Sequence, residues 1–551
     1  MSAAEDELGQ LTREVAAAAL GFVDLRPGQA EAITAVLAGK DALVIMPTGS
    51  GKSAIYQIAG ALLNGATVVI SPLIALQRDQ VESIGKLLGG AGQVNSSMSS
   101  AQRRRTFEGL DAGNLEFVFV APEQLANEET LERITAVKPS LFVVDEAHCI
   151  SSWGHDFRPE YLRLGTMVEA LGHPQVLALT ATAAPPVRAE IVEQLRMRDP
   201  EVIVQGFFRP NIHLEVVTAH KAKQAHQALV ERALALDGTG IIYVALRKQA
   251  EDLAAELRAG GREAAAYHAG MPTRQRTAVH ERFADQRPFI VVATIAFGMG
   301  IDVPHVRFVL HADPPESLDA YYQEFGRCGR DGEAAQAVLF RSHDDAGGRR
   351  FFAGTTDIPS ALLEKLASAI TIALEPLPVT TLAHLCGVPA TRLTVALDRL
   401  EKVGAIEVDS DGMVSQVEGG PSPVAAARDA VADHESYRTA ERTRTEMMRS
   451  YLETDGCRWR MLLGYFGQPA EERCGRCDNC AAGLTAHEAD DDRPFPLESR
   501  VVHARWGEGQ VIGYEDDTMT VLFAGGGYRT LAVDVVVEKG LLTRSRGVPG
   551  R

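Results

Sequence analysis

Two successive sets of short, unbroken apolar runs constrain this chain more than any other feature of its sequence. Each run is rich in Val, Ile, Leu or Ala, and the runs are separated by segments long enough for a helix. Strands buried on both faces of a parallel sheet have this composition, whereas half-exposed strands alternate apolar and polar residues. The first set comprises ALVIM (42–46), TVVIS (67–71), EFVFV (116–120), LFVVD (141–145) and QVLALT (175–180). The second comprises GIIYV (240–244), AAAYH (264–268), FIVVAT (289–294), VRFVLH (306–311) and AVLF (337–340). This alternation predicts an α/β fold with two tandem parallel-sheet domains that join near Gly206.

From about residue 356 the pattern changes to helices and short hairpins. The stretch at 379–408 predicts a short helix, a turn at Gly387 and a second helix with a leucine-lined face that ends at Gly404. AIEVDSDGMVSQ then predicts a hairpin, so we expect a winged helix. Further on we expect a linker at 419–424, helices over 436–468 and a small β-barrel over 500–533.

Length, charge and hydropathy narrow the class of protein. At roughly 150 residues per domain, 551 residues predict three or four domains, and 46% hydrophobic with 23% charged residues is typical of a globular chain. No apolar run reaches the roughly 18 residues of a membrane helix, and the N-terminal stretch lacks the pattern of a secretory signal. We therefore expect a cytoplasmic protein with no membrane partner. The net charge of −18 argues only mildly against nucleic acid, because binding depends on local basic patches.

The stretch MPTGSGKS predicts a phosphate-binding loop, because it follows a strand and precedes a helix. Gly49 and Gly51 let backbone N–H groups turn toward a phosphate, and the helix N-terminus adds partial positive charge. Lys52 is expected to reach the β- and γ-phosphates of ATP, and Ser53 to ligate Mg²⁺. The general pattern begins with glycine where this chain has methionine. The remaining candidate nucleotide contacts in the loop are Pro47, Thr48 and Ser50.

Two adjacent acids and two arginines complete a candidate hydrolytic site. Asp145 and Glu146 follow the LFVV run, where one carboxylate can hold Mg²⁺ and its neighbour can orient the attacking water. QEFGRCGRDG (323–332) contributes a further candidate nucleotide contact and two candidate catalytic arginines, namely Gln323, Arg327 and Arg330. Arginines three residues apart can share a helix face, from which they would neutralise charge on the transferring phosphate.

Four of the seven cysteines lie in one segment near the C-terminal end: Cys457, Cys474, Cys477 and Cys480. A disulfide framework is not expected in a long chain without a secretory signal. Two CxxC turns and a fourth thiolate from a helix start instead fit one Zn²⁺, and four protein ligands indicate a structural site. Arginines in the preceding helix either follow a DNA backbone or form a solvated face.

In order and spacing, these motifs resemble those of the bacterial RecQ helicases, a family of helicase superfamily 2. The resemblance spans about residues 20–345 and resumes at CGRCDNC, which follows RWRMLLGYFG. It includes SPLIALQRDQ (71–80), LALTATA (177–183), ATIAFGMGIDVPHVRFVLHADPP (293–315) and YYQEFGRCGRDG (321–332), several of which are generic to the superfamily. The loop ISSWGHDFRPEY (150–161) is far more specific to RecQ.

The resemblance implies an adenine site and a domain order. GFVDLRPGQ looks like the family's adenine-recognition motif, in which Gln29 would read the adenine edge while Phe22 and Arg26 pack on the base. Two RecA-like domains would be followed by the winged helix, a helical zinc-binding module and the small barrel-like tail. In the common RecQ order the winged helix comes after the zinc module instead. The expected boundaries are 1–205, 206–345, 356–420, 436–485 and 497–545.

The aromatic loop is implied to sense single-stranded DNA. Trp153 and Phe157 would stack on bases, and Arg158 would meet a phosphate or the nucleotide site. His155 would orient the loop. Because the loop follows the two acids directly, DNA binding would move them into place for hydrolysis.

Taken together, the resemblance implies an ATP-dependent DNA helicase that moves 3′→5′ in recombination and repair. Its cofactors would be ATP, Mg²⁺ and Zn²⁺. Its partners would be single-stranded DNA, tailed or forked duplex DNA, and a single-stranded-DNA-binding protein. One alternative is a motor that acts on RNA, against which the aromatic loop and the cysteines argue. A second is a DNA-binding regulator with a winged helix and a vestigial ATPase, which the intact Lys52, Glu146 and Arg330 oppose.

Overall fold

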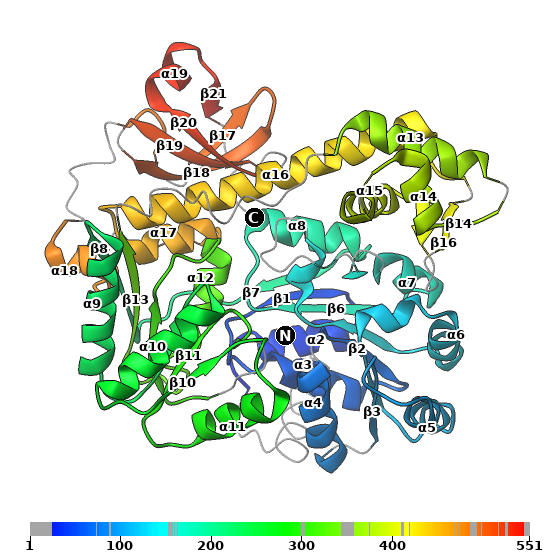
Figure 1. Ribbon diagram of the computed structural model, residues 1–551, viewed down its shortest axis with the longest axis horizontal. Coiled ribbons are helices and arrows are strands. Elements are labelled where there is room, and N and C mark those ends of the chain that lie inside the picture. Colours follow the sequence, from blue (N-terminus) through cyan, green and yellow to red (C-terminus); the bar gives the residue numbers. More distant parts are fainter. Residues whose placement is uncertain are drawn as a thin grey trace. The chain divides into compact units, whose positions relative to one another are not determined.

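The computed structural model describes residues 25–544 apart from short gaps (Figure 1). The gaps are 73, 88–89, 152–157, 159, 162–163, 299–302, 343–357, 374, 389, 409–412, 418, 469, 472, 485–492, 497–498, 516 and 524–526. The chain forms two compact units, one comprising Met1–Asp344 with Arg444–Arg551 and the other Asp345–Thr443. Among the described residues, no helix is both long enough and apolar enough to cross a membrane.

The first sheet has seven strands in the order β3-β4-β2-β5-β6-β1-β7, and all neighbouring strands are parallel. The strands are β1 (Ala42–Ile45), β2 (Thr67–Ile70), β3 (Ala91–Val94), β4 (Phe117–Val120), β5 (Leu141–Val144), β6 (Gln175–Thr180) and β7 (Glu201–Val204). Alternate residues of the central strands enter two separate hydrophobic cores, so both faces are covered. The two strands that the sequence did not predict, β3 and β7, are the half-exposed edges.

Helices flank this sheet, as Figure 1 shows in blue and cyan. They are α2 (Gln29–Leu37), α3 (Lys52–Leu62), α4 (Ile74–Leu87), α5 (Ser100–Asp111), α6 (Glu128–Val137), α7 (Leu164–Ala170) and α8 (Pro185–Gln194), with short 3₁₀ turns at Pro122–Ala126 and Ala147–Ile150. β1, β5 and β6 are neighbours, so the loops at their carboxyl ends lie at the same edge of the sheet.

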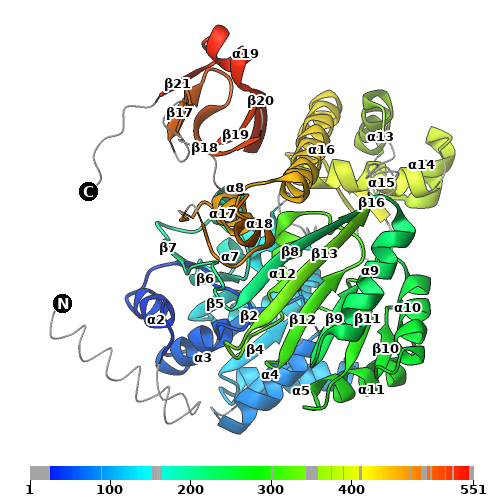
Figure 2. The same ribbon diagram turned by 90° about the vertical axis from the view of Figure 1, so that its left-hand side faces the viewer.

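The second sheet has six parallel strands in the order β10-β11-β9-β12-β13-β8 (Figure 2). They are β8 (Ile212–Ala219), β9 (Thr239–Tyr243), β10 (Ala264–Tyr267), β11 (Ile290–Ala293), β12 (Val306–His311) and β13 (Ala335–Ser342). The helices are α9 (Ala222–Ala235), α10 (Arg247–Ala259), α11 (Thr273–Ala284) and α12 (Leu318–Phe325). Again the strand that the sequence did not predict, β8, is an edge strand with a mixed burial pattern.

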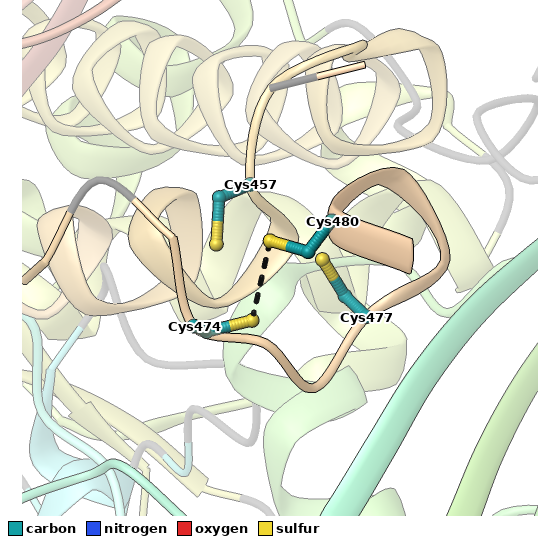
Figure 3. Close-up of side chains that lie close together, drawn as sticks. All are labelled: Cys457, Cys474, Cys477 and Cys480. Atoms are coloured by element: carbon teal, nitrogen blue, oxygen red, sulfur yellow. Dashed lines mark hydrogen bonds between the residues drawn. The ribbon is translucent and has the colours of Figure 1, made fainter. Parts of the chain in front are cut away.

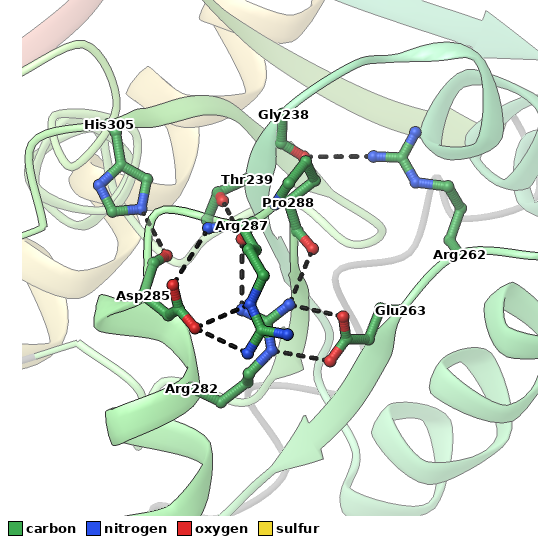
Figure 4. Close-up of polar contacts among 9 residues, drawn as sticks. All are labelled: Gly238, Thr239, Arg262, Glu263, Arg282, Asp285, Arg287, Pro288 and His305. Atoms are coloured by element: carbon green, nitrogen blue, oxygen red, sulfur yellow. Dashed lines mark hydrogen bonds and ion pairs between the residues drawn. The ribbon is translucent and has the colours of Figure 1, made fainter.

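A polar network holds the loops at the amino edge of the second sheet (Figure 4). Arg282 makes two hydrogen bonds to the Glu263 carboxylate, of 2.7 and 2.5 Å, and one of 3.2 Å to the Pro288 carbonyl oxygen. These bonds lower the pKa of Glu263. His305 Nε2 lies 3.0 Å from the Asp285 carbonyl oxygen. The network lies opposite the carboxyl edge, where ligands of parallel sheets bind, so we regard it as structural.

The second unit contains the two helices and the two hairpin strands predicted after residue 379, which are α14 (Val379–Cys386), α15 (Ala390–Lys402), β15 (Ile406–Val408) and β16 (Met413–Gln416). Before them lie a helix and a short strand that the sequence did not predict, α13 (Ser360–Ile372) and β14 (Leu377–Pro378). β14 adds a third strand to the predicted hairpin, in the order β14-β16-β15. The helix α16 (Pro423–Glu453) begins inside the expected linker 419–424, because proline is tolerated in the first turn of a helix.

Beyond α16 the chain forms the cysteine-bearing segment and the tail. The cysteine segment contains α17 (Arg458–Tyr465) and α18 (Asp478–Ala482). The tail contains β17 (Arg500–His503), β18 (Gly507–Glu515), β19 (Thr518–Phe523), β20 (Gly527–Ala532), α19 (Val533–Glu538) and β21 (Leu542–Arg544). Its described strands pair antiparallel in the order β20-β19-β18-β17-β21 around a small core of their own.

Candidate functional site

The phosphate-binding loop lies between β1 and α3. Gly49 and Gly51 have φ values of 80° and 82°, a backbone conformation that favours glycine and that lets the loop turn its N–H groups inward. Lys52 begins α3, and its Nζ donates to the Met46 carbonyl oxygen over 3.1 Å. The Met46 side chain is buried in the core of one sheet face, a location that suits an apolar residue at this position.

Burial and neighbouring charges set the ionisation of this site. Burial lowers the pKa of Lys52, although nearby Glu146 and Asp145 act in the opposite direction. Burial, and then the charge of Glu146, raises the pKa of Asp145 to about 7. The buried Oγ of Ser50 has no hydrogen-bond partner within the described part of the chain. A lysine, two acids and an unsatisfied hydroxyl around one loop suit a multiply charged ligand such as a nucleotide phosphate.

Arg26 and Gln29 hydrogen-bond to the backbone of the phosphate-binding loop. Gln29 is buried, and its Nε2 donates to the carbonyl oxygens of Ser50 and Gly51 over 3.1 and 2.9 Å. Its Oε1 accepts from the Arg26 N–H over 2.8 Å, while the Arg26 guanidinium donates to the Gly49 carbonyl oxygen. Their contact with adenine stays a prediction, and the candidate base-packing residue Phe22 lies outside the described residues.

The two acids follow β5, and a histidine that the sequence did not predict as part of the site lies close to one of them. The Asp145 N–H donates to the Ile70 carbonyl oxygen over 2.9 Å. Glu146 has a φ of 49°, which is uncommon for a residue with a side chain. His148 Nδ1 lies 3.3 Å from Glu146 Oε2 and 2.9 Å from Thr180 Oγ1. The position of His148 two residues after the second acid was the only signal in the sequence.

The aromatic loop begins and ends close to these acids. Its central residues lie outside the described part of the structure, among them Trp153, His155 and Phe157. Where the loop returns, the Arg158 N–H donates to the Cys149 carbonyl oxygen over 2.8 Å. Tyr161 is fully buried and donates its hydroxyl to the Asp145 carbonyl oxygen over 3.1 Å. The base of the loop is therefore fixed to the segment that carries the acids, whereas its DNA contacts stay a prediction.

The two candidate arginines do not share a helix face, so that prediction was wrong. α12, which carries the half-buried Gln323, ends at Phe325, and Arg327 and Arg330 lie in the glycine-containing turn that follows. Arg327 is buried and donates to the Gly298 carbonyl oxygen in its own domain. Arg330 instead packs on the phosphate-binding loop, where a Cβ added to Gly49 would lie 3.1 Å from Arg330 Cδ.

The four cysteines of the C-terminal segment meet at one point, as Figure 3 shows. Their Sγ atoms all lie within 4.8 Å of one another, and those of Cys474 and Cys480 are 3.8 Å apart. Zn–S bonds of about 2.3 Å in a tetrahedron require nearly this S–S separation. Hydrogen bonds from the Cys474 and Cys477 thiols lower the pKa of Cys457 to about 3. The donor set fits a structural zinc ion.

Three family models match successive parts of the chain. They are the DEAD/DEAH box helicase over 26–190, the helicase conserved C-terminal domain over 221–332 and the RecQ zinc-binding domain over 418–481. A Bacillus subtilis protein named "Probable ATP-dependent DNA helicase RecS" is 32% identical over 487 residues, which cover 87% of this chain and 94% of that protein. The chain belongs to the RecQ family of helicases. The resemblance inferred from the motifs is thereby confirmed.

Further comparisons, with a second relative and with a solved structure, agree in fold. The ATP-dependent DNA helicase RecQ of Pasteurella multocida is 44% identical over 339 residues, covering 61% of this chain and 53% of that protein. The chain thus spans about half the length of that relative. The Mycobacterium smegmatis helicase Lhr, solved with ssDNA and AMP-PNP, has a TM-score of 0.50 and 23% identity, with 78% of this chain and 61% of that chain covered. The parallel-sheet RecA-like domains and the zinc-binding segment are confirmed, and ATP and zinc are the indicated ligands.

The RecQ-type zinc segment covers the outer edge of β8, a contact that the sequence did not predict. The Leu214 N–H donates to the Arg476 carbonyl oxygen over 3.0 Å, and the Val216 N–H donates to Asp478 Oδ2 over 2.9 Å. Trp459 is fully buried and its Nε1 donates to the Ile212 carbonyl oxygen over 3.3 Å. These contacts satisfy polar groups that an exposed edge strand would leave open.

Proposed function

We propose that this chain is an ATP-dependent DNA helicase that moves 3′→5′ on single-stranded DNA and unwinds duplexes in recombination and repair. The observation that carries the proposal is the meeting of Lys52, Asp145, Glu146 and Arg330 at one phosphate-binding loop. Arg330 comes from the second sheet and the other three residues from the first. Closure of the two domains on ATP would therefore assemble the site, and reopening would disassemble it. Family membership supports DNA as the substrate, and the polarity follows from the resemblance.

Each charged residue has a separate task in the proposed reaction. Lys52 neutralises charge on the β- and γ-phosphates, and Glu146 orients and polarises the attacking water. His148 lies 3.3 Å from Glu146 Oε2, and when protonated it would hold the carboxylate in place. Arg330, together with Arg327, neutralises the charge that develops on the transferred phosphoryl group.

Mg²⁺ fits the residues at the end of β5. Asp145 is a buried carboxylate whose pKa is raised by burial and then by the charge of Glu146, and a divalent cation would favour its ionised form. Asp145 and Ser53 would hold the ion. When bound, Mg²⁺ would neutralise phosphate charge and fix the orientation of the phosphates.

The aromatic loop connects DNA binding to hydrolysis in this proposal. Bases that stack on Trp153 and Phe157 would displace the loop, which His155 would orient. The displacement would be transmitted to Arg158 and Tyr161, where the loop ends. Tyr161 is hydrogen-bonded to the backbone of Asp145, so a displacement of the loop would reach the acids within a few bonds. We propose that this connection makes ATP hydrolysis depend on single-stranded DNA.

The substrates of the proposed reaction are single-stranded, tailed and forked duplex DNA, and a single-stranded-DNA-binding protein is a proposed partner. We place the enzyme in the cytoplasm with its substrate.

A strand-displacement assay with 3′-tailed and 5′-tailed duplexes tests the proposed function. With ATP, the 3′-tailed duplex should be unwound and the 5′-tailed duplex should remain paired. Unwinding of RNA duplexes alone would support an RNA motor instead. Specific duplex binding without any ATP turnover would support a DNA-binding regulator.

A further inference from the structure

The segment that joins the two sheets, residues 205–211, contacts both parts of the candidate ATP site. It starts at the end of β1, where the Gln205 N–H donates to the Ile45 carbonyl oxygen over 2.9 Å, directly before the phosphate-binding loop. The same glutamine packs on the backbone next to Gln29, because a Cβ added to Gly28 would lie 2.5 Å from Gln205 Nε2. It ends at β8, beside the turn that carries Arg330.

Two side chains of this segment donate hydrogen bonds to the backbone of the arginine turn. Arg209 donates to three carbonyl oxygens of the turn, at 3.4, 3.2 and 2.7 Å, which belong to Gly326, Cys328 and Gly329. Asn211 Nδ2 donates to the Gly329 carbonyl oxygen over 2.7 Å and to the Glu333 carbonyl oxygen over 2.9 Å. The arginine turn therefore has little freedom to move without the joining segment.

The fit around Gly329 is close. Its φ is 61°, and an added Cβ would lie 2.4 Å from Asn211 Nδ2. The Gly329 N–H donates to the Val306 carbonyl oxygen over 2.8 Å, which fixes the turn to β12 as well. Earlier in the joining segment, the Phe207 carbonyl oxygen accepts a hydrogen bond from the Tyr322 hydroxyl of α12 over 2.7 Å. The joining segment is thus hydrogen-bonded to α12 and to the turn that follows it.

We propose that Arg209 and Asn211 are positioning residues for ATP hydrolysis, which hold the turn so that Arg330 faces the phosphate-binding loop. This inference rests on the proposed function. The rigid connection from β1 through Arg209 to the turn means that the angle between the two domains and the position of Arg330 change together. Positively charged groups aimed at a transferring phosphate are effective only when they are placed beforehand.

Arg209→Ala in the full chain tests this inference. The kcat of ATP hydrolysis with single-stranded DNA should fall roughly 10-fold to 100-fold, while the KM for ATP and the Kd for DNA stay within about twofold of wild type. Arg262→Ala is the matched control. The Arg262 guanidinium also donates to carbonyl oxygens at the end of α9 and in the loop that follows, those of Leu234, Leu236 and Gly238, but at the opposite edge of the same sheet. Figure 4 shows the contact with Gly238. Arg262→Ala should leave kcat unchanged.

A double variant separates positioning from general damage. If Arg209 acts through Arg330, then Arg209→Ala should cost nothing further in an Arg330→Ala background. Asn211→Ser, which removes the amide donor, should behave in the same way and replaces Arg209→Ala if that variant does not fold. An unchanged kcat in both variants, or a full further loss in the Arg330→Ala background, would overturn the proposal.

Hydrogen exchange gives a readout that does not need ATP turnover. Amides of residues 326–330 should exchange faster in Arg209→Ala and Asn211→Ser than in wild type or Arg262→Ala. Unchanged exchange would show that Arg209 and Asn211 do not hold the turn, even if the enzyme is an active helicase. A wild-type protein without ATPase activity would instead refute the proposed function, and the exchange result would still decide whether these two residues hold the turn.

Discussion

Burial of charged side chains decides the chemistry of the ATP site at the scale of single residues. Lys52 and Asp145 are both buried, and burial moves each pKa toward the neutral form of the group. The charged forms of these two groups are unfavourable while the site is empty, and a charged ligand of opposite sign stabilises them. The lysine and the acids are therefore expected to be essential for turnover but not for folding.

Lys52→Ala and Glu146→Gln test these roles directly. Each should lower the kcat of ATP hydrolysis by about 100-fold or more and abolish unwinding, while DNA affinity stays within a few-fold of wild type. Lys40→Ala is a suitable control, because Lys40 forms an exposed ion pair with Glu201 in the same domain. Full unwinding by either site variant would refute the assigned roles.

Asp145→Asn should stabilise the ligand-free protein in a pH-dependent way. The folded pKa of Asp145, about 7, lies above its ordinary value of 3.8, so ionisation opposes folding. The penalty is fully present above pH 7 and vanishes as the pH falls below 3.8, where folded and unfolded chains are both protonated. It amounts to at most about 4 kcal/mol. Melting curves should show a higher Tm for the variant at pH 8, and the difference should shrink steadily as the pH falls toward 3.8. A lower Tm at pH 8 would contradict the account, and the exposed Asp237→Asn serves as a control.

At the scale of elements, burial on both faces is what made strands predictable. Runs such as ALVIM and LFVVD mark central strands, whose composition follows from their surroundings. The edge strands β3, β7 and β8 each include a polar residue or a glycine, so their unbroken apolar runs are shorter than those of the central strands. The arginine turn was mistaken for helix because a three-residue spacing is also helical, although Gly326 and Gly329 were visible in the sequence.

The candidate site was predictable where its residues are adjacent in sequence. The phosphate-binding loop and the acid pair each have a short pattern with a physical reason. His148 and Arg209 were missed, because their roles depend on contacts with Thr180 and with the arginine turn that no local pattern encodes.

The zinc segment offers a prediction at the same scale. Cys477→Ser should lose the metal and destabilise the packing of this segment on β8, because Leu214 pairs with Cys477 and Cys477 is fully buried. Metal analysis of the wild type should find about one zinc per chain. Cys386→Ser, which changes a cysteine outside the cluster, should keep the metal. A wild-type protein without zinc would remove the basis of the prediction.

At the scale of the whole molecule, α17 connects the tail to both motor domains. Phe466 stacks on Phe207 of the joining segment at 4.2 Å, and its carbonyl oxygen accepts from Arg188 of α8 over 2.6 Å. Tyr465 bonds to Asp319 of α12 and stacks on Tyr528 of the tail at 4.8 Å. None of these aromatic contacts follows from sequence spacing, since the partners are more than fifty residues apart.

Tyr528→Ala should release the tail from α17. Tyr528 is buried and its hydroxyl donates to the Tyr465 carbonyl oxygen over 2.5 Å, so the truncation removes about 3–5 kcal/mol from docking. Limited proteolysis should then detach residues 500–544 faster than in wild type. Tyr528→Phe, which loses only the hydroxyl, should have a much smaller effect of about 1 kcal/mol. Equal cleavage of all three proteins would show that the tail is not held here.

Coupling of DNA binding to the acids through the aromatic loop is what would make this chain a DNA-dependent motor. The most direct measurement is the ratio of ATP turnover with and without single-stranded DNA, in wild type and in Trp153→Ala. We predict that Trp153→Ala keeps its basal turnover and loses most of its stimulation, by about 10-fold or more, because one stacked base contributes about 1–3 kcal/mol. An unchanged stimulation ratio would contradict the coupling and leave the position of the loop beside Asp145 and Glu146 without a function.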